Sequence, residues 1–341
     1  MDISGWPPAV RLHVVTGKGG TGKTTVAAAL ALALATGGRR TLLIEVEGRQ
    51  GIAQVFDTAP LPYEERRIAV APGGGEVRAL AVDPEAALLE YLEMFYRLGL
   101  AGRTLRRMGA IEFATTLAPG LRDVLLTGKA KETVTRTGAG GRPVYDAVVL
   151  DAPPTGRIVG FLDVTKAMAD LARTGPIHKQ SEGVARLVHS PQTAVHLVTL
   201  LEDLPVTETL ETVDELAAAG LQHGAVIVNK VRPQWLPDRS VAPAAGGRVD
   251  AGRIRAGLAT AGLDLPADVV DGLVAETVEH AVRVAAEAAA MQRLRTEPRA
   301  PLPLLELPRI IDGVDLGSLY ELAEALVEQG VAVPARTGVG A

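Results

Sequence analysis

Cysteine is absent from this sequence of 341 residues, which excludes disulfides, thiolate zinc sites and iron–sulfur ligation. Aromatic residues make up only 3% of the chain, and the net charge of −5 offers no basic surface to nucleic acid or anionic lipid. The longest apolar run, residues 26–35, is too short to span a bilayer, which needs about 20 residues. We therefore expect no nucleic-acid partner, no stable membrane insertion and a cytoplasmic location.

The order of apolar runs predicts an α/β fold. Short β-prone runs occur at residues 12–15, 41–46, 147–150, 195–200 and 225–228. The first two flank a glycine-rich loop and an Ala/Leu-rich segment, so residues 12–46 form a predicted strand–loop–helix–strand unit, which implies a parallel sheet. We predict a mostly parallel, twisted sheet flanked by helices, with the 26–35 run as a buried helix.

Three further stretches have a different character. Residues 84–137 show helical spacing without β-branched runs, which predicts an inserted α-helical subdomain, and more helices are expected over about 163–188. Residues 232–260 are rich in Pro, Gly, Ala and Arg, which predicts a mobile loop. The whole is expected to form a single domain over 10–330, with a flexible tail at 331–341.

The loop after the first strand carries the strongest chemical signal. Residues 17–25 (GKGGTGKTT) contain the full G-x-x-x-x-G-K-T pattern between a strand and a helix. Glycines let backbone N–H groups wrap a phosphate chain, and the following helix points its positive end at the same anion. A turn that merely joins strand to helix is the alternative. The predicted nucleotide-binding residues are Gly17, Lys18, Gly19, Gly20, Thr21, Gly22, Lys23, Thr24 and Thr25.

Three side chains of this loop have predicted roles in phosphate chemistry. Lys23 would neutralise the β- and γ-phosphates, and the Thr24 hydroxyl would bind Mg²⁺. Lys18 is not needed to cradle phosphates within one subunit. The loop resembles the deviant KGGxGKT class of ATPases, which implies that Lys18 reaches the nucleotide of a dimer partner and acts in catalysis there. A solvated surface lysine is the alternative.

Residues 151–156 (DAPPTG) extend the resemblance. They are similar to the switch II segment of the ATPases that drive arsenite pumps and target tail-anchored proteins. The resemblance implies a P-loop NTPase fold, ATP or ADP with Mg²⁺ as cofactors, and Asp151 as a metal residue acting through water. It also implies γ-phosphate sensing by Thr155 and Gly156, and base contacts from Asn229, Lys230 and Pro308.

The chain departs from that family in switch I. The family's Asp-Pro-Ala-His falls on Glu47, Gly48, Arg49 and Gln50. Glu47 keeps the carboxylate but adds a methylene, and a misplacement of about 1 Å can cost around a hundredfold in rate. Glu47 could be a working base, a poor base, or only a contact to Mg²⁺ and water. The family's cysteine metalloid site and zinc clamp are missing.

The resemblance implies a dimeric ATPase that couples MgATP turnover to binding a protein client, which could be a membrane protein. The insertion offers candidate groove residues: Leu89, Leu92, Met94, Phe95, Leu98, Leu100, Met108, Ile111 and Phe113. The alternative is a regulatory subunit with weak turnover, in a heterodimer with a paralogous ATPase. A Min/Par-type positioning ATPase would need a basic amphipathic C-terminal helix, which is absent. Homodimer and heterodimer both stay open.

Overall fold

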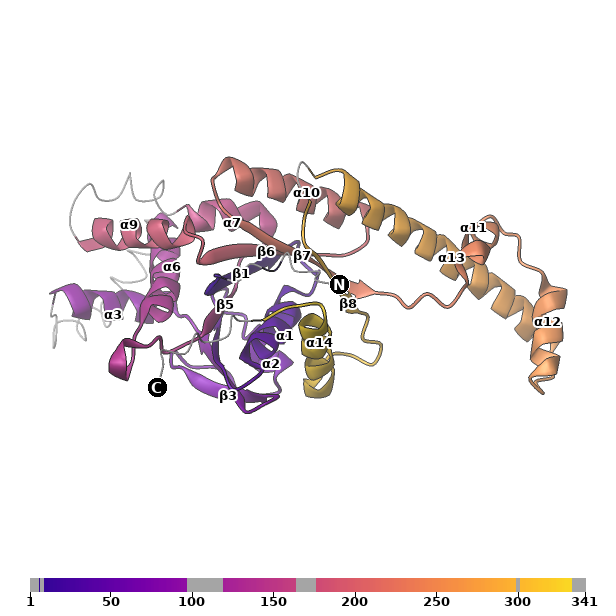
Figure 1. Ribbon diagram of the computed structural model, residues 1–341, viewed down its shortest axis with the longest axis horizontal. Coiled ribbons are helices and arrows are strands. Elements are labelled where there is room, and N and C mark those ends of the chain that lie inside the picture. Colours follow the sequence, from indigo (N-terminus) through magenta and orange to yellow (C-terminus); the bar gives the residue numbers. More distant parts are fainter. Residues whose placement is uncertain (1–5, 7–8, 97–118, 164–175, 299–300, 333–341) are drawn as a thin grey trace, which may run out of the picture.

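The computed structural model describes Trp6 and residues 9–96, 119–163, 176–298 and 301–332. An eight-stranded sheet runs in the order β3-β4-β2-β5-β1-β6-β7-β8 (Figure 1). Among the described strands, only β3 and β4 pair antiparallel, so the predicted mostly parallel sheet is confirmed. The strands are β1 (Leu12–Gly17), β2 (Arg40–Glu45), β3 (Arg66–Ala71), β4 (Gly75–Ala81), β5 (Ala147–Asp151), β6 (Thr193–Thr199), β7 (His223–Val231) and β8 (Leu304–Pro308).

All five predicted strands are present, and β3, β4 and β8 are additional. The missed hairpin of β3 and β4 lies at the edge of the sheet and carries charged residues within its strands, so it has no continuous apolar run. The other edge strand, β8, is short and bounded by prolines. Edge strands are buried on fewer sides than central ones, so their sequences resemble loops.

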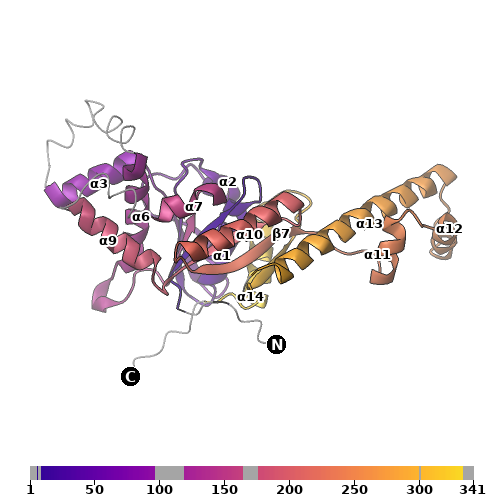
Figure 2. The same cartoon turned by 90° about the horizontal axis from the view of Figure 1, so that it is seen from above.

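Helices cover both faces of the sheet (Figures 1 and 2). The apolar cluster on one face includes residues of α1, α2 and α14, and the cluster on the other includes residues of α3, α6, α7, α9, α10 and α13. The helices are α1 (Lys23–Ala35), α2 (Gly51–Val55), α3 (Pro84–Tyr96), α6 (Pro119–Thr135), α7 (Thr155–Leu162), α9 (Pro176–Val188), α10 (Asp203–Ala218), α11 (Asp238–Ala245), α12 (Ala251–Thr260), α13 (Ala267–Thr296) and α14 (Leu316–Glu328).

The helix α1 is enclosed on every side. All ten residues of the 26–35 run are buried, which confirms the predicted buried helix. The helix packs between the sheet and α14. A helix that is apolar all round belongs in a core, and here its first turn is fixed directly behind the glycine-rich loop.

The predicted helical insertion lies at one end of the sheet. Helices α3 and α6 fall within 84–137 and pack together, and α6 also contacts α9 (Figure 2). Residues 97–118 and 164–175 lie outside the described residues, as do most of the candidate groove side chains. Leu89 is described, and it packs half-buried against the core.

An arm of helices α11–α13 extends from the opposite end of the sheet (Figure 1). The prediction of a mobile loop at 232–260 was wrong, because α11 and α12 occupy much of that range. Alanine-rich composition and an N-cap at Asp250, which accepts a hydrogen bond from the Arg253 N–H, outweigh the Pro and Gly content. Helix α13, with 30 residues, is about 45 Å long.

The two ends of the described chain meet. The indole N–H of Trp6 donates to the Ala332 carbonyl at 3.0 Å, and Val331 is buried. Residues 333–341 of the predicted tail lie outside the described part. Within that part, no helix combines the length and the apolar character that crossing a membrane requires.

Candidate functional site

The sequence-predicted site residues gather at one edge of the sheet. The carboxyl ends of parallel strands all point to this edge, which is where open α/β sheets bind ligands. The glycine-rich loop follows β1, Asp151 ends β5, Asn229 lies near the end of β7, and Pro308 ends β8. A cavity of about 470 Å³ opens here, and its lining includes Gly22, Thr25, Asn229, Lys230 and Pro308.

The loop adopts a conformation that only glycines permit easily. Gly20 and Gly22 have φ of 88° and 90°, in the left-handed region. A Cβ on Gly17 would lie 2.2 Å from the Val198 carbonyl oxygen of β6. The Thr21 hydroxyl donates to the Lys18 carbonyl at 2.8 Å and closes the turn from within.

The same loop is open toward an anion. A Cβ at Gly19 or Gly20 would meet nothing within 4 Å, so this stretch of backbone is accessible. Helix α1 starts at Lys23 without a side-chain cap, which leaves its first N–H groups to be satisfied by a ligand or water. An uncapped helix start behind an accessible glycine loop fits a bound phosphate chain.

Thr24 and Asp151 form the candidate magnesium centre. The Thr24 hydroxyl donates to Asp151 Oδ2 at 2.7 Å, and Asp151 is only 7% exposed. Burial raises the pKa of Asp151 to about 6, while the Thr24 hydrogen bond and the nearby Lys23 oppose that rise. No three His, Cys, Asp or Glu side chains among the described residues converge as direct metal ligands. Mg²⁺ usually keeps several waters, so this pair fits a hydrated ion held partly by phosphate oxygens.

Switch II is connected to the strand before the loop. The Thr16 hydroxyl at the end of β1 donates to the Pro153 carbonyl at 2.6 Å. Thr155 is buried as the first residue of α7, and Gly156 beside it is exposed. The structure thus brings these two residues to the same edge as Asp151; their γ-phosphate role stays a prediction.

Glu47 lies in the loop between β2 and α2. Its side chain is about 21% exposed, and Oε1 lies 3.9 Å from Arg49 Nη2. Glu47 also contributes to the raised pKa of Asp151, although less than burial does, so the two carboxylates are electrostatic neighbours. The arrangement keeps Glu47 close to the candidate magnesium centre, and its part in hydrolysis stays a prediction.

Lys18 has a partner that the sequence reasoning missed. Its Nζ donates to Glu208 Oε1 of α10 at 2.6 Å, and both side chains are about 30% exposed. Lys18 is therefore held by its own chain rather than freely solvated. A signal was present in the sequence, because Glu208 belongs to a Glu-Thr pair, but nothing local placed this segment beside the loop.

Asn229 braces the glycine-rich loop. Its side-chain N–H donates to the Thr21 carbonyl at 2.8 Å, and its Oδ1 accepts from the Lys230 N–H at 2.9 Å. Lys230 has φ of 59°, and its Nζ lies 3.4 Å from the Gly20 carbonyl oxygen. These contacts fix the loop from the β7 side, and recognition of a base by the two residues stays a prediction.

The chain is similar to a family of ATPases and to several of its known members. The family model for anion-transporting ATPases matches residues 10–191. The protein named ATPase BagA of Mycobacterium tuberculosis is 63% identical over 330 residues, which cover 96% of each chain. An arsenical pump-driving ATPase of Escherichia coli is 27% identical over 234 residues, 64% of this chain and 39% of that protein. ATPase get3 of Schizosaccharomyces japonicus is 29% identical over 178 residues, 50% of this chain and 51% of that protein.

Proposed function

Because this chain belongs to the family of anion-transporting ATPases, we propose that it is a MgATP-driven dimeric switch that binds a protein client at its helical insertion. The observation that carries the nucleotide part is the open glycine loop in front of an uncapped α1, beside the Thr24–Asp151 pair. Backbone donors, a helix start and a hydroxyl–carboxylate pair at one edge of the sheet are the parts that phosphoryl transfer requires.

Each residue of this edge has a role in the proposed reaction. In this proposal the loop N–H groups hold the phosphate chain, and the Lys23 ammonium neutralises the β- and γ-oxygens. Thr24 and Asp151 would hold Mg²⁺, which would supply positive charge to offset the charge that develops on the phosphates. Asp151 would help to hold the ion through water, and Glu47 would orient the attacking water. Lys18 supplies a positive charge to the transition state of a partner subunit, once it leaves Glu208.

One link joins switch II to the insertion. Arg157, in the first turn of α7, has Nη2 3.9 Å from Asp123 Oδ1 of α6. Arg157 directly follows Thr155 and Gly156, so a movement of these residues on nucleotide binding would act on α6. Arg157 is exposed and the two charged atoms are 3.9 Å apart, so the pair is worth little in stability and can break and re-form during a cycle.

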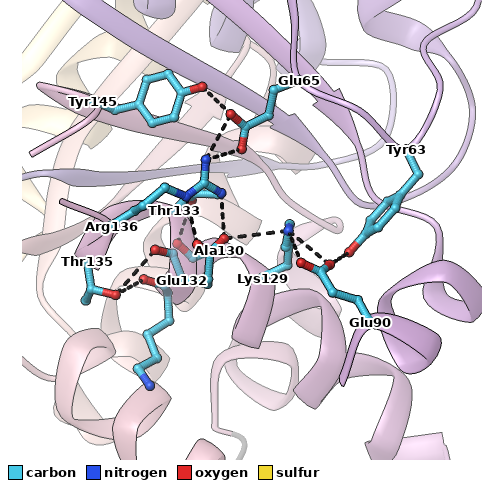
Figure 3. Close-up of polar contacts among 11 residues, drawn as sticks. Tyr63, Glu65, Glu90, Lys129, Ala130, Glu132, Thr133, Thr135, Arg136 and Tyr145 are labelled. Carbon is cyan, nitrogen blue, oxygen red and sulfur yellow. Dashed lines mark hydrogen bonds and ion pairs between the residues drawn. The ribbon is translucent and has the colours of Figure 1, made fainter. Parts of the chain in front are cut away.

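A second link joins switch I to the insertion through side-chain and backbone contacts. The Gln50 amide donates to the Leu61 carbonyl at 3.1 Å, and its Oε1 accepts from the Leu61 N–H at 2.7 Å. Two residues on, the Tyr63 hydroxyl donates to Glu90 of α3, whose carboxylate pairs with Lys129 of α6 at 2.8 Å (Figure 3). The loop that carries Glu47 is thus connected to both insertion helices.

The base of α6 is anchored to the sheet by the same group of charges. Arg136 pairs with Glu132 one turn earlier and with Glu65, which precedes β3, at 2.6 and 2.8 Å (Figure 3). Glu65 also accepts from the Tyr145 hydroxyl just before β5. Half-buried, charge-assisted bonds on both sides hold the end of α6 rigidly, so the proposed movement concerns its first turns.

Steady-state ATP turnover of the protein alone, with Lys23→Ala as the blank, tests the catalytic part. We expect Lys23→Ala to abolish nucleotide binding or turnover, and Lys18→Ala to spare binding while removing turnover. Equal affinity and equal rate in the wild type and both variants would refute the site. Binding of MgATP without turnover would favour the alternative, a regulatory subunit that needs a paralogous ATPase as partner.

Hydrogen exchange of residues 119–135 tests the coupling part. We expect MgATP to change the protection of α6 in the wild type, and Arg157→Ala to reduce this change while nucleotide affinity stays the same. Arg186→Ala on α9, whose Nε donates to the Glu182 carbonyl of the same helix, is the matched control. If α6 does not respond to MgATP in the wild type, the client-switch proposal loses its support.

A further inference from the structure

Glu45 is a buried carboxylate on the same side of the sheet as the candidate magnesium centre. It ends β2 and is the register partner of Asp151, which ends the neighbouring β5. Side chains alternate between faces along a strand. Two residues back on each strand, Leu43 and Val149 belong to the apolar cluster that packs on α1. Glu45 and Asp151 therefore both point to the α1 side, where Thr24 lies.

The two carboxylate oxygens of Glu45 differ in their partners. Oε2 accepts the Ile52 N–H at the start of α2 at 3.1 Å. The whole residue is only 2% exposed, and Oε1 is fully buried. This oxygen has no hydrogen-bond partner in the described part of the chain. A buried carboxylate oxygen without a donor is costly, so this atom calls for a ligand that donates a hydrogen bond.

The neighbourhood of Glu45 shows where that donor would be. Gly51 precedes Ile52, and a Cβ built on Gly51 would lie 3.2 Å from Thr24 Cγ2 and 3.5 Å from Thr24 Oγ1. The peptide that Glu45 holds therefore lies directly against the side chain of Thr24. The contacts Thr24–Asp151 and Glu45–Ile52 therefore lie next to each other at the start of α1.

We propose that Glu45 is an additional residue of the magnesium site, with Oε1 accepting a hydrogen bond from a water bound to the Mg²⁺ of MgATP. This rests on the function proposed above, since it takes MgATP as the ligand. A contact through water agrees with the absence of three converging direct ligands among the described side chains. Mg²⁺ binds few protein groups directly, and it keeps waters that outer carboxylates orient.

The same carboxylate gives switch I a means of responding to the metal. Oε2 fixes the Ile52 N–H and with it the end of the loop at residues 46–50, which carries Glu47. If Oε1 binds a metal water at the same time, arrival of Mg²⁺ fixes the carboxylate and hence this loop. Glu45 is in this sense a positioning residue for Glu47.

The variant Glu45→Gln separates the two contacts. Its amide oxygen can still accept the Ile52 N–H, but an NH₂ group replaces Oε1 and cannot accept a hydrogen bond from water. ATP binding is titrated with Mg²⁺, and ATP affinity is also measured in EDTA. We expect the Mg²⁺ concentration for half-maximal binding to rise about 10- to 100-fold. ATP affinity in EDTA should stay at the wild-type value.

Glu76→Gln is the matched control, with the same chemical change at the opposite end of the sheet. Glu76 is the register partner of Arg40 at the start of β2, and its carboxylate contacts Arg40 and Arg78 at 3.1 and 2.7 Å. This variant should keep the wild-type Mg²⁺ titration. The control shows whether an altered Mg²⁺ titration comes from loss of one negative charge anywhere in the chain or from the change beside the metal.

The outcomes separate the two proposals. If wild-type protein binds ATP without any dependence on Mg²⁺, or not at all, the proposed function fails. If the wild type depends on Mg²⁺ and Glu45→Gln titrates as it does, the assignment of Glu45 is overturned. Should Glu45→Gln lose its helical circular dichroism, Glu45→Asp is titrated instead, because its shorter carboxylate cannot span both contacts. The same rise is expected, and a wild-type titration would again overturn the assignment.

Discussion

Two buried histidines should make the stability of this protein depend on pH between 7 and 5. His13 of β1 and His196 of β6 are 1% and 0% exposed, with His13 Nδ1 3.1 Å from His196 Nε2. The Ala225 N–H donates to His196 Nδ1 at 3.1 Å. His196 must then carry its proton on Nε2 and donate it to His13. Trp6 stacks on both rings, at centroid distances of 5.4 and 4.8 Å.

An added proton has no acceptor in this arrangement. On His196 Nδ1 the added proton would face the Ala225 N–H, and on His13 Nδ1 it would face the His196 Nε2–H. Burial lowers the pKa of His196 to about 3, and burial together with the neighbouring His196 holds the pKa of His13 well below its ordinary value. Both rings therefore stay neutral in the folded protein over the range in which a free histidine becomes charged.

The size of the effect follows from proton linkage. Below about pH 6.5 the unfolded chain binds protons at these histidines and the folded chain does not, so stability falls as pH falls. The loss begins at the unfolded pKa and continues until the pH reaches the folded pKa. Each histidine should lower the free energy of unfolding by about 2 kcal/mol between pH 7 and pH 5, and the pair by about 4 kcal/mol.

Urea unfolding of the wild type, His13→Gln and His196→Gln at pH 7 and pH 5 measures this. The quantity compared is the difference in unfolding free energy between the two pH values, which cancels the packing cost of each substitution. Each variant should reduce that difference by about 2 kcal/mol. His189→Gln, which changes an exposed histidine, should leave it unchanged. Equal differences in the wild type and both buried-site variants would refute the reasoning.

Two backbone features give further predictions. Gly22→Ala should lower the free energy of unfolding by about 2–4 kcal/mol, because φ is 90° and the new Cβ would lie 2.5 Å from Asn229 Nδ2. Gly19→Ala meets nothing within 4 Å and should be nearly neutral; a similar loss in both variants would contradict this. Asp315→Ala should lower the melting temperature, since it removes the capping box with Ser318, and an unchanged melting temperature would argue against that role.

The sequence by itself determined the parts that depend on local pattern. The 26–35 run predicted a buried helix, because a helix with these residues is apolar on every side. The G-x-x-x-x-G-K-T pattern fixed the loop, because positive φ at Gly20 and Gly22 requires residues without a Cβ. Five central strands were predicted because strands buried on both faces are continuously apolar.

Prediction from local pattern failed where tertiary packing outweighs amino-acid composition. The range 232–260 reads as a loop from its Pro and Gly content, yet it holds α11 and α12. The helix propensity of this range is low. The Asp250 N-cap stabilises α12, and packing against α13 stabilises both α11 and α12. The edge strands β3 and β8 were missed because partial burial removes the apolar signal. Strand β4 was missed because Glu76 and Arg78 interrupt its apolar run.

Only the tertiary structure decided which distant side chains meet at the site. Glu45 appears in the sequence as one charge in an apolar strand, and the parallel register of β2 with β5 is what sets it beside Asp151. Lys18 and Glu208 are 190 residues apart, and the placement of α10 joins them. Such contacts depend on strand order and on the side of the sheet that each helix covers. No local segment contains that information, because it arises only when the whole core packs together.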